Sequence, residues 1–104
     1  MSKMQVKPTH KMVSFLKKIL DGCTVDLVEL SPEQFKWYVD YNEFDHESDF
    51  NWETRTFKVI RVSYPDEYYA CPKYLTTKDL QFCLKHSNKT LDSFLNEVKA
   101  FCAI

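Results

Sequence analysis

Glycine is almost absent from this chain of 104 residues, because Gly22 is the only one. An average chain of this length carries about seven glycines. Loops that cradle phosphate groups need several of them, so that backbone N–H groups can approach the phosphate. The sequence contains no dinucleotide-binding or P-loop spacing, and no G-x-S-x-G segment of the kind that carries a nucleophilic serine. It therefore lacks the motifs of these nucleotide-binding and hydrolase classes.

Closely spaced cysteine pairs and long apolar segments are also absent. The four cysteines are Cys23, Cys71, Cys83 and Cys102, and no two of them have C-x-x-C spacing. No apolar run approaches the ~20 residues that a membrane-spanning helix needs. The first residues do not form the apolar segment of a secretory signal. We therefore expect a cytoplasmic protein with free thiols, and no association with a membrane.

The residues that are present are typical of a globular protein. Hydrophobic residues make up 44% of the chain and charged residues 28%, both close to globular averages. Aromatic residues reach 15%, with eight Phe, six Tyr and two Trp. The length is that of one ordinary domain. We expect residues 1–104 to form a single domain with one hydrophobic core.

Local patterns predict the first elements of this domain. Apolar residues between positions 12 and 20 recur at helical spacing, which predicts a helix over residues 8–21 that begins at Pro8 or Thr9. Gly22 then supplies a left-handed residue of the kind that often follows a helix. Apolar and polar residues alternate over positions 23–30, which predicts a strand.

The next segment is ambiguous, and a strand pairing follows it. Ser31, Pro32 and Gln34 have the spacing of a helix start with a capping box. Residues 35–41 fit a helix and a strand equally well, and we favour a helix because the start signal is specific. Residues 54–64 predict a strand, and a turn at 65–66 leads to a return strand over 68–71. We expect Pro72 to end that pairing.

Two helices complete the predicted fold. Thr76 or Thr77 begins one that runs to about His86, and Thr90 begins the last. Apolar residues in the last helix form a stripe with spacings of three and four: Leu91, Phe94, Leu95, Val98, Phe101 and Cys102. The sequence thus predicts an α+β fold. It has an N-terminal helix, a small antiparallel sheet made of the 54–71 hairpin and the strand 23–30, and two C-terminal helices packed on that sheet.

Metal and catalytic chemistry have weak support. Cys83 and His86 are three residues apart on a predicted helix, and with Cys71 and Cys102 they have the ligand types of a zinc site. The alternative is that both helical cysteines are small core residues. No zinc-knuckle spacing supports the metal, and no spacing pairs a histidine with a nucleophile. We therefore predict that the protein has no metal, binds no cofactor and is not an enzyme.

Charge is distributed unevenly along the chain. Residues 1–20 carry five lysines and no acid, whereas residues 21–53 carry ten acids and one base, a local net charge of −9. Six of these acids lie within residues 40–53, interleaved with four aromatic residues. We predict that this run contacts a partner, and its candidate binding residues are Asp40, Tyr41, Glu43, Phe44, Asp45, Glu47, Asp49, Phe50, Trp52 and Glu53. The alternative is a solvated acidic loop whose aromatic residues belong to the core.

These observations lead to a hypothesis of function. The composition resembles that of small accessory proteins encoded by bacteriophages and mobile elements. We predict a small non-catalytic protein-interaction module, an inhibitor that imitates DNA and occludes a basic nucleic-acid-binding surface of a host enzyme, as in an anti-defence or anti-CRISPR role. The alternative is a nucleic-acid-binding or transcription-accessory domain that uses the lysine-rich first helix. Direct nucleic-acid binding is less favoured, because the whole chain has a net charge of −1.

Overall fold

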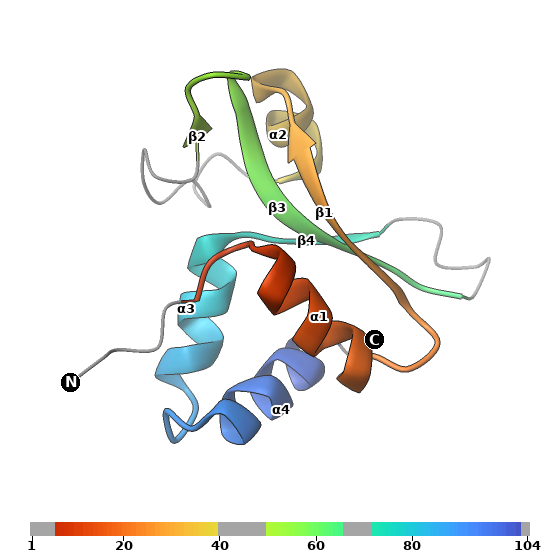
Figure 1. Cartoon of the computed structure of the whole chain (residues 1–104), viewed down its shortest axis with the longest axis vertical. Helices are drawn as coiled ribbons and strands as arrows, with labels where there is room; N and C mark the ends of the chain where they lie inside the picture. Colours follow the sequence, from red (N-terminus) through yellow and green to blue (C-terminus); the bar gives the residue numbers. More distant parts are fainter. Residues whose placement is uncertain (1–5, 40–49, 66–71, 103–104) are drawn as a thin grey trace.

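The computed structural model describes residues 6–39, 50–65 and 72–102. The described part of the chain forms four helices and four strands, which confirms the predicted α+β class (Figure 1). In chain order these are α1 (His10–Ile19), β1 (Thr24–Leu30), α2 (Pro32–Tyr38), β2 (Phe50–Asn51), β3 (Thr56–Ser63), β4 (Lys73–Leu75), α3 (Thr77–Lys85) and α4 (Leu91–Cys102).

All four strands join in one antiparallel sheet with β3 at its centre. One side of β3 pairs with β1 from Thr24 opposite Ser63 to Leu30 opposite Phe57. The other side is shared, because β2 pairs with the start of β3 and β4 pairs with its second half. The predicted pairing of the segments near 23–30 and 54–64 therefore lies within one sheet.

Two features of the sheet differ from the sequence expectation. The predicted return strand at 68–71 lies outside the described residues, and the described partner of β3 is β4, which begins after Pro72. The prediction that Pro72 ends the pairing is therefore wrong. Pro72 precedes the first residue of β4 and so takes no place in the ladder, where a missing N–H group would matter. The short strand β2 was not predicted, because two residues are too few to show alternation.

Strand alternation divides the apolar side chains between the two faces of the sheet. Residues opposite one another in the register point to the same face, and neighbours along a strand point to opposite faces. One face carries Val25, Ile60 and Val62 and packs against α1, α3 and α4. The other face carries Leu30, Phe57 and Val59. A single strand, β3, thus contributes to two separate clusters of buried residues.

The larger cluster is built mostly from residues of α1, α3 and α4. Helix α1 contributes Met12 and Leu16, and α4 contributes Phe94 and Val98. Each of these pairs has the four-residue spacing that places side chains on one face of a helix. The smaller cluster joins Phe35 and Val39 from α2 to the opposite face of the sheet. Figure 1 shows α2 at one end of the sheet, away from the other three helices.

Helix starts follow the capping residues that the sequence indicates. The Ser31 backbone N–H donates to Gln34 Oε1 at 3.0 Å, and the Gln34 backbone N–H donates to Ser31 Oγ at 3.2 Å, so the capping box is formed. Residues Pro32–Tyr38 are therefore helical, and Val39 returns to extended backbone. Thr9 caps α1, and Thr76 caps α3 through a second capping box. The helix favoured for the ambiguous segment is confirmed.

Gly22 lies in the turn between α1 and β1 with a φ of +82°. Helix α1 ends earlier than predicted, at Ile19, and the backbone N–H of Leu20 donates to the carbonyl of Leu16. A Cβ atom at position 22 would meet only Pro65 Cγ, at 3.9 Å. Left-handed backbone, and not lack of space, therefore favours glycine at this position.

No helix in the described ranges is both long enough and apolar enough to cross a membrane.

Candidate functional site

Large aromatic side chains are exposed where the sheet extends beyond α1, α3 and α4. Helix α2 and the hairpin of β2 and β3 lie at this end of the molecule (Figure 1). Trp37 is 84% exposed, Trp52 is 64% exposed and Tyr38 is 56% exposed. Tryptophan and tyrosine of this exposure are typical of protein contact surfaces. We refer to Trp37, Tyr38 and Trp52 together as the aromatic end.

Buried rings support the aromatic end from below. Phe35 of α2 stacks on Phe57 of β3, with ring centroids 4.4 Å apart. Phe50 of β2 contacts Phe57 edge-on at 4.9 Å, and Trp52 contacts Phe50 edge-on at 4.8 Å. A continuous series of ring contacts therefore runs from α2 through β3 to the hairpin turn. Edge-on and offset contacts of this kind are favourable beyond their buried area.

Trp37 faces away from these rings. It follows Phe35 by two residues, a rotation of about 200° around a helix axis, and Phe35 is buried on the sheet. Trp37 lines a shallow hollow of about 380 Å³ with Glu33 and Lys36. Its neighbour Tyr38 stacks on Tyr74 of β4, with centroids 5.1 Å apart. The outer surface of α2 therefore presents an indole ring between two opposite charges.

Hydrogen bonds hold the turn that carries Trp52. Asn51 Oδ1 accepts from the backbone N–H groups of Glu53 at 3.0 Å and Thr54 at 3.4 Å. Arg55 has a φ of +57°, which closes the turn in a left-handed conformation. Asn51 Nδ2 also donates to Glu29 Oε1 on β1, at 3.4 Å. The turn is thus hydrogen-bonded to β1, and the backbone that carries Trp52 is held in one conformation.

The Glu29 carboxylate lies on the outer strand next to this turn. Glu29 Oε2 accepts from Thr56 Oγ1 at 2.7 Å and from Thr54 Oγ1 at 3.2 Å. The hydrogen bond from Thr56 is the main cause that lowers the pKa of Glu29 below its usual value of 4.5, while desolvation opposes it. The carboxylate therefore stays ionised at neutral pH and has a fixed orientation.

The candidate binding residues predicted from the sequence fall into two groups. Seven of them lie outside the described residues: Asp40, Tyr41, Glu43, Phe44, Asp45, Glu47 and Asp49. Of the other three, Phe50 is half-buried against Phe57, whereas Trp52 and Glu53 are exposed. Phe50 therefore helps to support the sheet end and Trp52 is free to meet a partner.

The sequence interpretation missed Trp37 and Tyr38 as surface candidates. A signal was present, because the helix that was favoured for this segment places Phe35, Tyr38 and Val39 on its apolar face and leaves Trp37 off it. An aromatic residue off the apolar face of a helix is exposed unless another element covers it. Tyr38 remains more than half exposed because its contact with Tyr74 covers only part of the ring.

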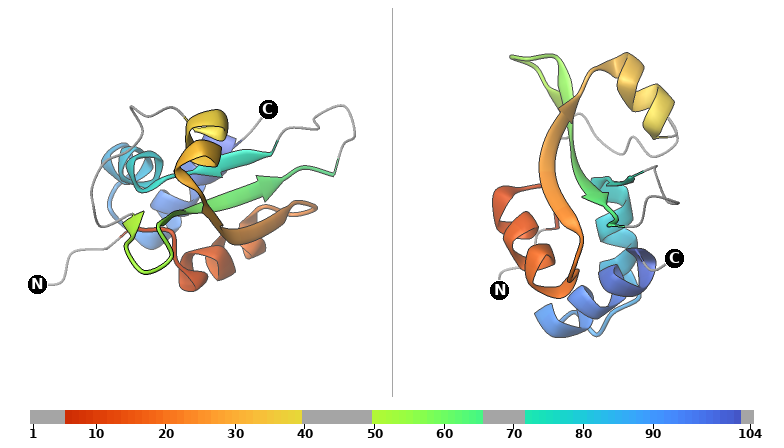
Figure 2. Two further views of the ribbon diagram at one scale, coloured as in Figure 1. Left: turned by 90° about the horizontal axis from the view of Figure 1, so that it is seen from above. Right: turned by 90° about the vertical axis from the view of Figure 1, so that its right-hand side faces the viewer.

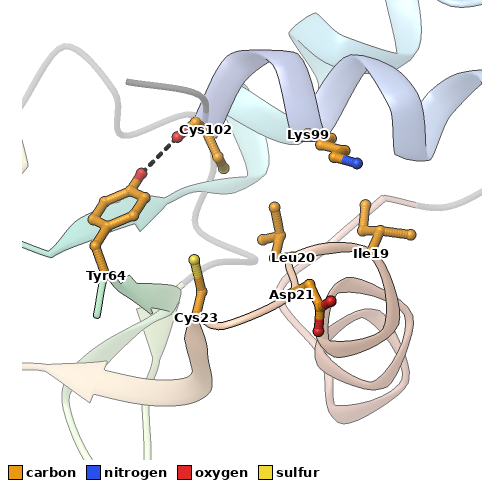
Figure 3. A pocket seen from close by; sticks show the side chains of 7 residues that line it. All are labelled: Ile19, Leu20, Asp21, Cys23, Tyr64, Lys99 and Cys102. Carbon is orange, nitrogen blue, oxygen red and sulfur yellow. Dashed lines mark hydrogen bonds between the residues drawn. The ribbon is translucent and has the colours of Figure 1, made fainter. Parts of the chain in front are cut away.

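A second hollow, of about 430 Å³, lies between the end of α1, the start of β1 and the end of α4 (Figure 3). Tyr64 donates its hydroxyl hydrogen to the Cys102 carbonyl at 2.8 Å across one side of it. The side chain of Cys23 points into the same space, and Lys99 and Asp21 lie toward the other side. Burial raises the pKa of Cys102 to about 12, so its thiol is protonated and is a poor nucleophile. Cys102 therefore supplies no activated nucleophile to this hollow.

The zinc hypothesis receives no support from the described residues. Cys71 lies outside them, and Cys83 and Cys102 are buried. The His86 ring packs against Phe82, with centroids 4.4 Å apart. Within ranges 6–39, 50–65 and 72–102, no three histidine, cysteine or acidic residues come close enough to hold a metal ion. Cys83 and Cys102 have the environment of core residues.

Basic residues are exposed on α1 and sparse on α4. Lys11, Lys17 and Lys18 are exposed on α1, and Lys7 precedes it. The outer face of α4 carries Lys99 together with Asp92, and a helix of mixed charge is a poor match for a recognition helix in DNA. Helix α1 carries three exposed lysines and no acid, whereas α3 carries the exposed lysines Lys78 and Lys85 beside Asp79. Among the described helices, α1 therefore offers the most basic surface.

A comparison of the chain with protein-family models, with curated proteins and with solved structures found no match. The arguments for function therefore come from the residues and their arrangement.

Proposed function

We propose that this protein is a non-catalytic protein-interaction module, that it binds a partner through the aromatic end, and that the contacted surface of the partner is basic. The nucleic-acid-binding site of an enzyme is such a surface, and occupation of that site would inhibit the enzyme. The observation that carries the proposal is the exposure of Trp37 and Trp52 on supported elements at one end of the sheet.

Exposed indole rings on a fixed base favour a contact function. Each exposes apolar area to water that a partner could cover, and each stands on an element that packed rings hold in place. Trp52 rests on Phe50, and α2 is anchored by Phe35. Tryptophan is among the residues most often responsible for the binding energy of protein interfaces.

Charge supports the choice of a basic partner. The segment 21–53, which includes β1, α2 and β2, has ten acids and one base. Within the described residues, the exposed acids Glu29, Glu33 and Glu53 of β1, α2 and the β2–β3 turn are matched by three exposed bases, Lys36, Arg55 and Lys58. The acidic surplus therefore comes from the five acids among residues 40–49 of the sequence. Carboxylates beside aromatic anchors complement the lysines and arginines that bind a phosphate backbone.

The test is an affinity capture from the native host with three versions of the protein. These are the wild type, the double variant Trp37→Ala/Trp52→Ala, and the control Phe82→Ala, which removes a ring that is 52% exposed on α3. Partners are identified by mass spectrometry, and the affinity of the purified partner is then measured. We expect the double variant to lose at least about thirtyfold in affinity for the partner, and the control to bind as the wild type does.

Two further measurements decide the basic-partner half of the proposal. Affinity for the partner should fall as salt is raised, and DNA or RNA should compete with the protein for the partner. Replacement of Asp45, Glu47 and Asp49 by the corresponding amides should also weaken the complex. Equal binding by the Trp37→Ala/Trp52→Ala variant, or binding that ignores both salt and nucleic acid, would contradict the proposal.

The exposed lysines of α1 support a second candidate, direct binding to nucleic acid. Lys11, Lys17 and Lys18 share a helix without an acidic residue. A mobility-shift titration at about 50 mM salt, where electrostatic binding is strong, separates the two candidates. A shift that disappears in the Lys17→Ala/Lys18→Ala variant would favour this function, and the absence of any shift would exclude it.

A further inference from the structure

The outer edge of β1 is a long sheet edge without a described partner. Strand β1 stands at the end of the sheet order and pairs with β3 alone. Its backbone forms no hydrogen bond with any other element in the described parts of the chain. In the side view of Figure 2 no described element passes in front of β1 along its length. No described backbone therefore lies alongside the outer edge of β1 in that view.

An edge of this kind offers backbone groups to an added strand. In an antiparallel pair, alternate residues direct their N–H and C=O groups toward the partner strand, and the others direct theirs outward. About half of the seven residues of β1 therefore have free donors and acceptors on the outer side. Partners that bind by strand addition use such groups, and side-chain positions then set the specificity.

Among the usual protections of a sheet edge, β1 has only charged side chains. Natural edges are often very short, or contain proline, charged residues such as lysine, or a bulge. Strand β1 has seven residues, the sequence Thr-Val-Asp-Leu-Val-Glu-Leu, and an unbroken register with β3. Its only charged residues are Asp26 and Glu29. Leu27 and Val28 between them are half-buried, so an added strand would cover apolar area.

The two acids determine which strand fits this edge. The register places Asp26 on the same face as Arg61, and Glu29 on the opposite face with Lys58. Asp26 Oδ2 lies 3.5 Å from Arg61 Nη2, and Glu29 is held by threonine hydroxyls. These contacts hold both carboxylates on the side of β3, but the Asp26 side chain is still 43% exposed and Glu29 is exposed, so both remain open to an added basic side chain. A second copy of β1 would bring two more acids and no base, whereas a basic strand would complement the charge.

We propose that β1 binds an extended segment of a partner protein by strand addition, and that this segment carries basic residues three positions apart with apolar residues between them. One basic side chain lies opposite Asp26 on one face of the sheet, and the other lies opposite Glu29 on the other face. The two intervening residues lie opposite Leu27 and Val28. This inference rests on the proposed function, since it describes how a basic partner is held.

The test uses a synthetic peptide with the pattern Thr-Thr-Lys-Val-Val-Lys-Thr-Thr and the whole protein. Amide hydrogen exchange is followed by NMR with and without the peptide. We expect amides within Thr24–Leu30 to become protected, because the added strand accepts hydrogen bonds from the outer edge. The same peptide with N-methylated valines lacks the backbone donors of those two residues. Its affinity for the protein should be at least about tenfold lower.

Charge exchange identifies the roles of the two acids. The variant Asp26→Lys/Glu29→Lys should lose about tenfold or more in affinity for the lysine peptide, and should gain affinity for the same peptide with glutamate in place of lysine. Circular dichroism checks that the variant is folded, and Asp26→Asn/Glu29→Gln provides a milder version that should lose the preference for lysine. The Phe82→Ala variant, which changes an exposed ring on α3, should bind the peptide like the wild type.

Several outcomes would overturn the inference. These are no binding at millimolar peptide, protection that appears outside β1, equal binding of the lysine and glutamate peptides, and sedimentation that shows a dimer paired through β1. The proposed function fails separately, if the captured partner still binds the Trp37→Ala/Trp52→Ala variant. If the Trp37→Ala/Trp52→Ala variant loses the partner but the peptide protects no amide of β1, the proposed function stands and the strand addition is excluded.

Discussion

Cys83 and Cys102 show how burial decides the chemistry of a residue. A cysteine thiolate can bind a zinc ion or act as a nucleophile. Cys83 is 2% exposed and Cys102 is 3% exposed, and both belong to the cluster that joins α1, α3 and α4 to the sheet. Desolvation is the main cause that raises the pKa of Cys83 to about 11 and that of Cys102 to about 12. They act as small apolar residues.

This burial predicts a loss of stability in alkaline solution. Thiols of the unfolded chain ionise near pH 9, whereas those of the folded protein keep their protons to about pH 11 and 12. The two buried, protonated thiols therefore contribute fully to the free energy of unfolding below pH 9. This contribution is lost as the pH rises through their pKa values in the folded protein. By pH 10, ionisation of each thiol in the unfolded chain should have lowered the free energy of unfolding by about 1 kcal/mol.

Urea denaturation at pH 8 and pH 10 measures this effect. Lysines and tyrosines also titrate in this range, so the useful quantity is the difference between the wild type and Cys83→Ala. The variant is less stable at both pH values because it leaves a cavity, but its stability should fall less between them. Equal pH slopes for the two proteins would show that the Cys83 thiol ionises similarly in both states.

Helix α2 illustrates the element scale, because its seven residues depend on the signals at its start. Ser31 and Gln34 exchange hydrogen bonds, and Pro32 takes the first helical position. A helix this short is unstable in isolation. Its place is therefore fixed by the capping box and by the packing of Phe35 and Val39 on the sheet.

Replacement of Ser31 by alanine should destabilise the protein by about 1 kcal/mol, because the backbone N–H of Gln34 loses its acceptor. The measurement is the urea midpoint of Ser31→Ala against Ser31→Asp, which can still accept from this N–H and should be close to the wild type. If α2 is held by packing alone, the two variants will have the same midpoint.

At the scale of the whole molecule, the described residues form two clusters of buried side chains on opposite faces of the sheet. Fifteen buried described residues form the cluster with α1, α3 and α4, and five form the cluster with α2. Stability rises with the apolar area that an element buries. Helix α2 and the support for the aromatic end are therefore on the less strongly packed side of β3.

Native-state hydrogen exchange should resolve this difference. Amides of α2 should exchange through local opening at a lower free energy than amides of α4 and the centre of β3. The variant Phe35→Ala should raise the exchange rate of α2 while α4 remains protected, whereas Phe94→Ala should affect the entire molecule. Uniform protection across α2, β3 and α4 would mean that the two clusters open as one unit.

Much of the secondary structure could be predicted because its signals are local. Apolar spacing within α1 and α4 and the alternation in β1 involve residues that are close in the sequence. The capping residues Thr9, Ser31 and Thr76 act within one turn of their helices. The pairing of β4 after Pro72 and the short strand β2 were missed, since each depends on contact with β3 and not on its own pattern.

The candidate site was less accessible to sequence reasoning. Phe50 and Trp52 belong to the same acidic and aromatic run, yet one is half-buried and the other is exposed. Composition cannot separate them, because their difference arises from the register of β2 and β3, which places Phe50 opposite Phe57. Trp37 could have been recognised from the helix pattern, once that helix was accepted.

The sequence by itself determined the four helices and the strands β1 and β3, and it determined the uneven charge along the chain. These properties depend on side-chain type and on spacings of two, three or four residues. The tertiary structure alone decided which face of β3 each element covers, that β1 stands at the end of the described strand order, and which rings remain in contact with water. Those properties depend on contacts between residues far apart in the chain, and such contacts leave no local pattern.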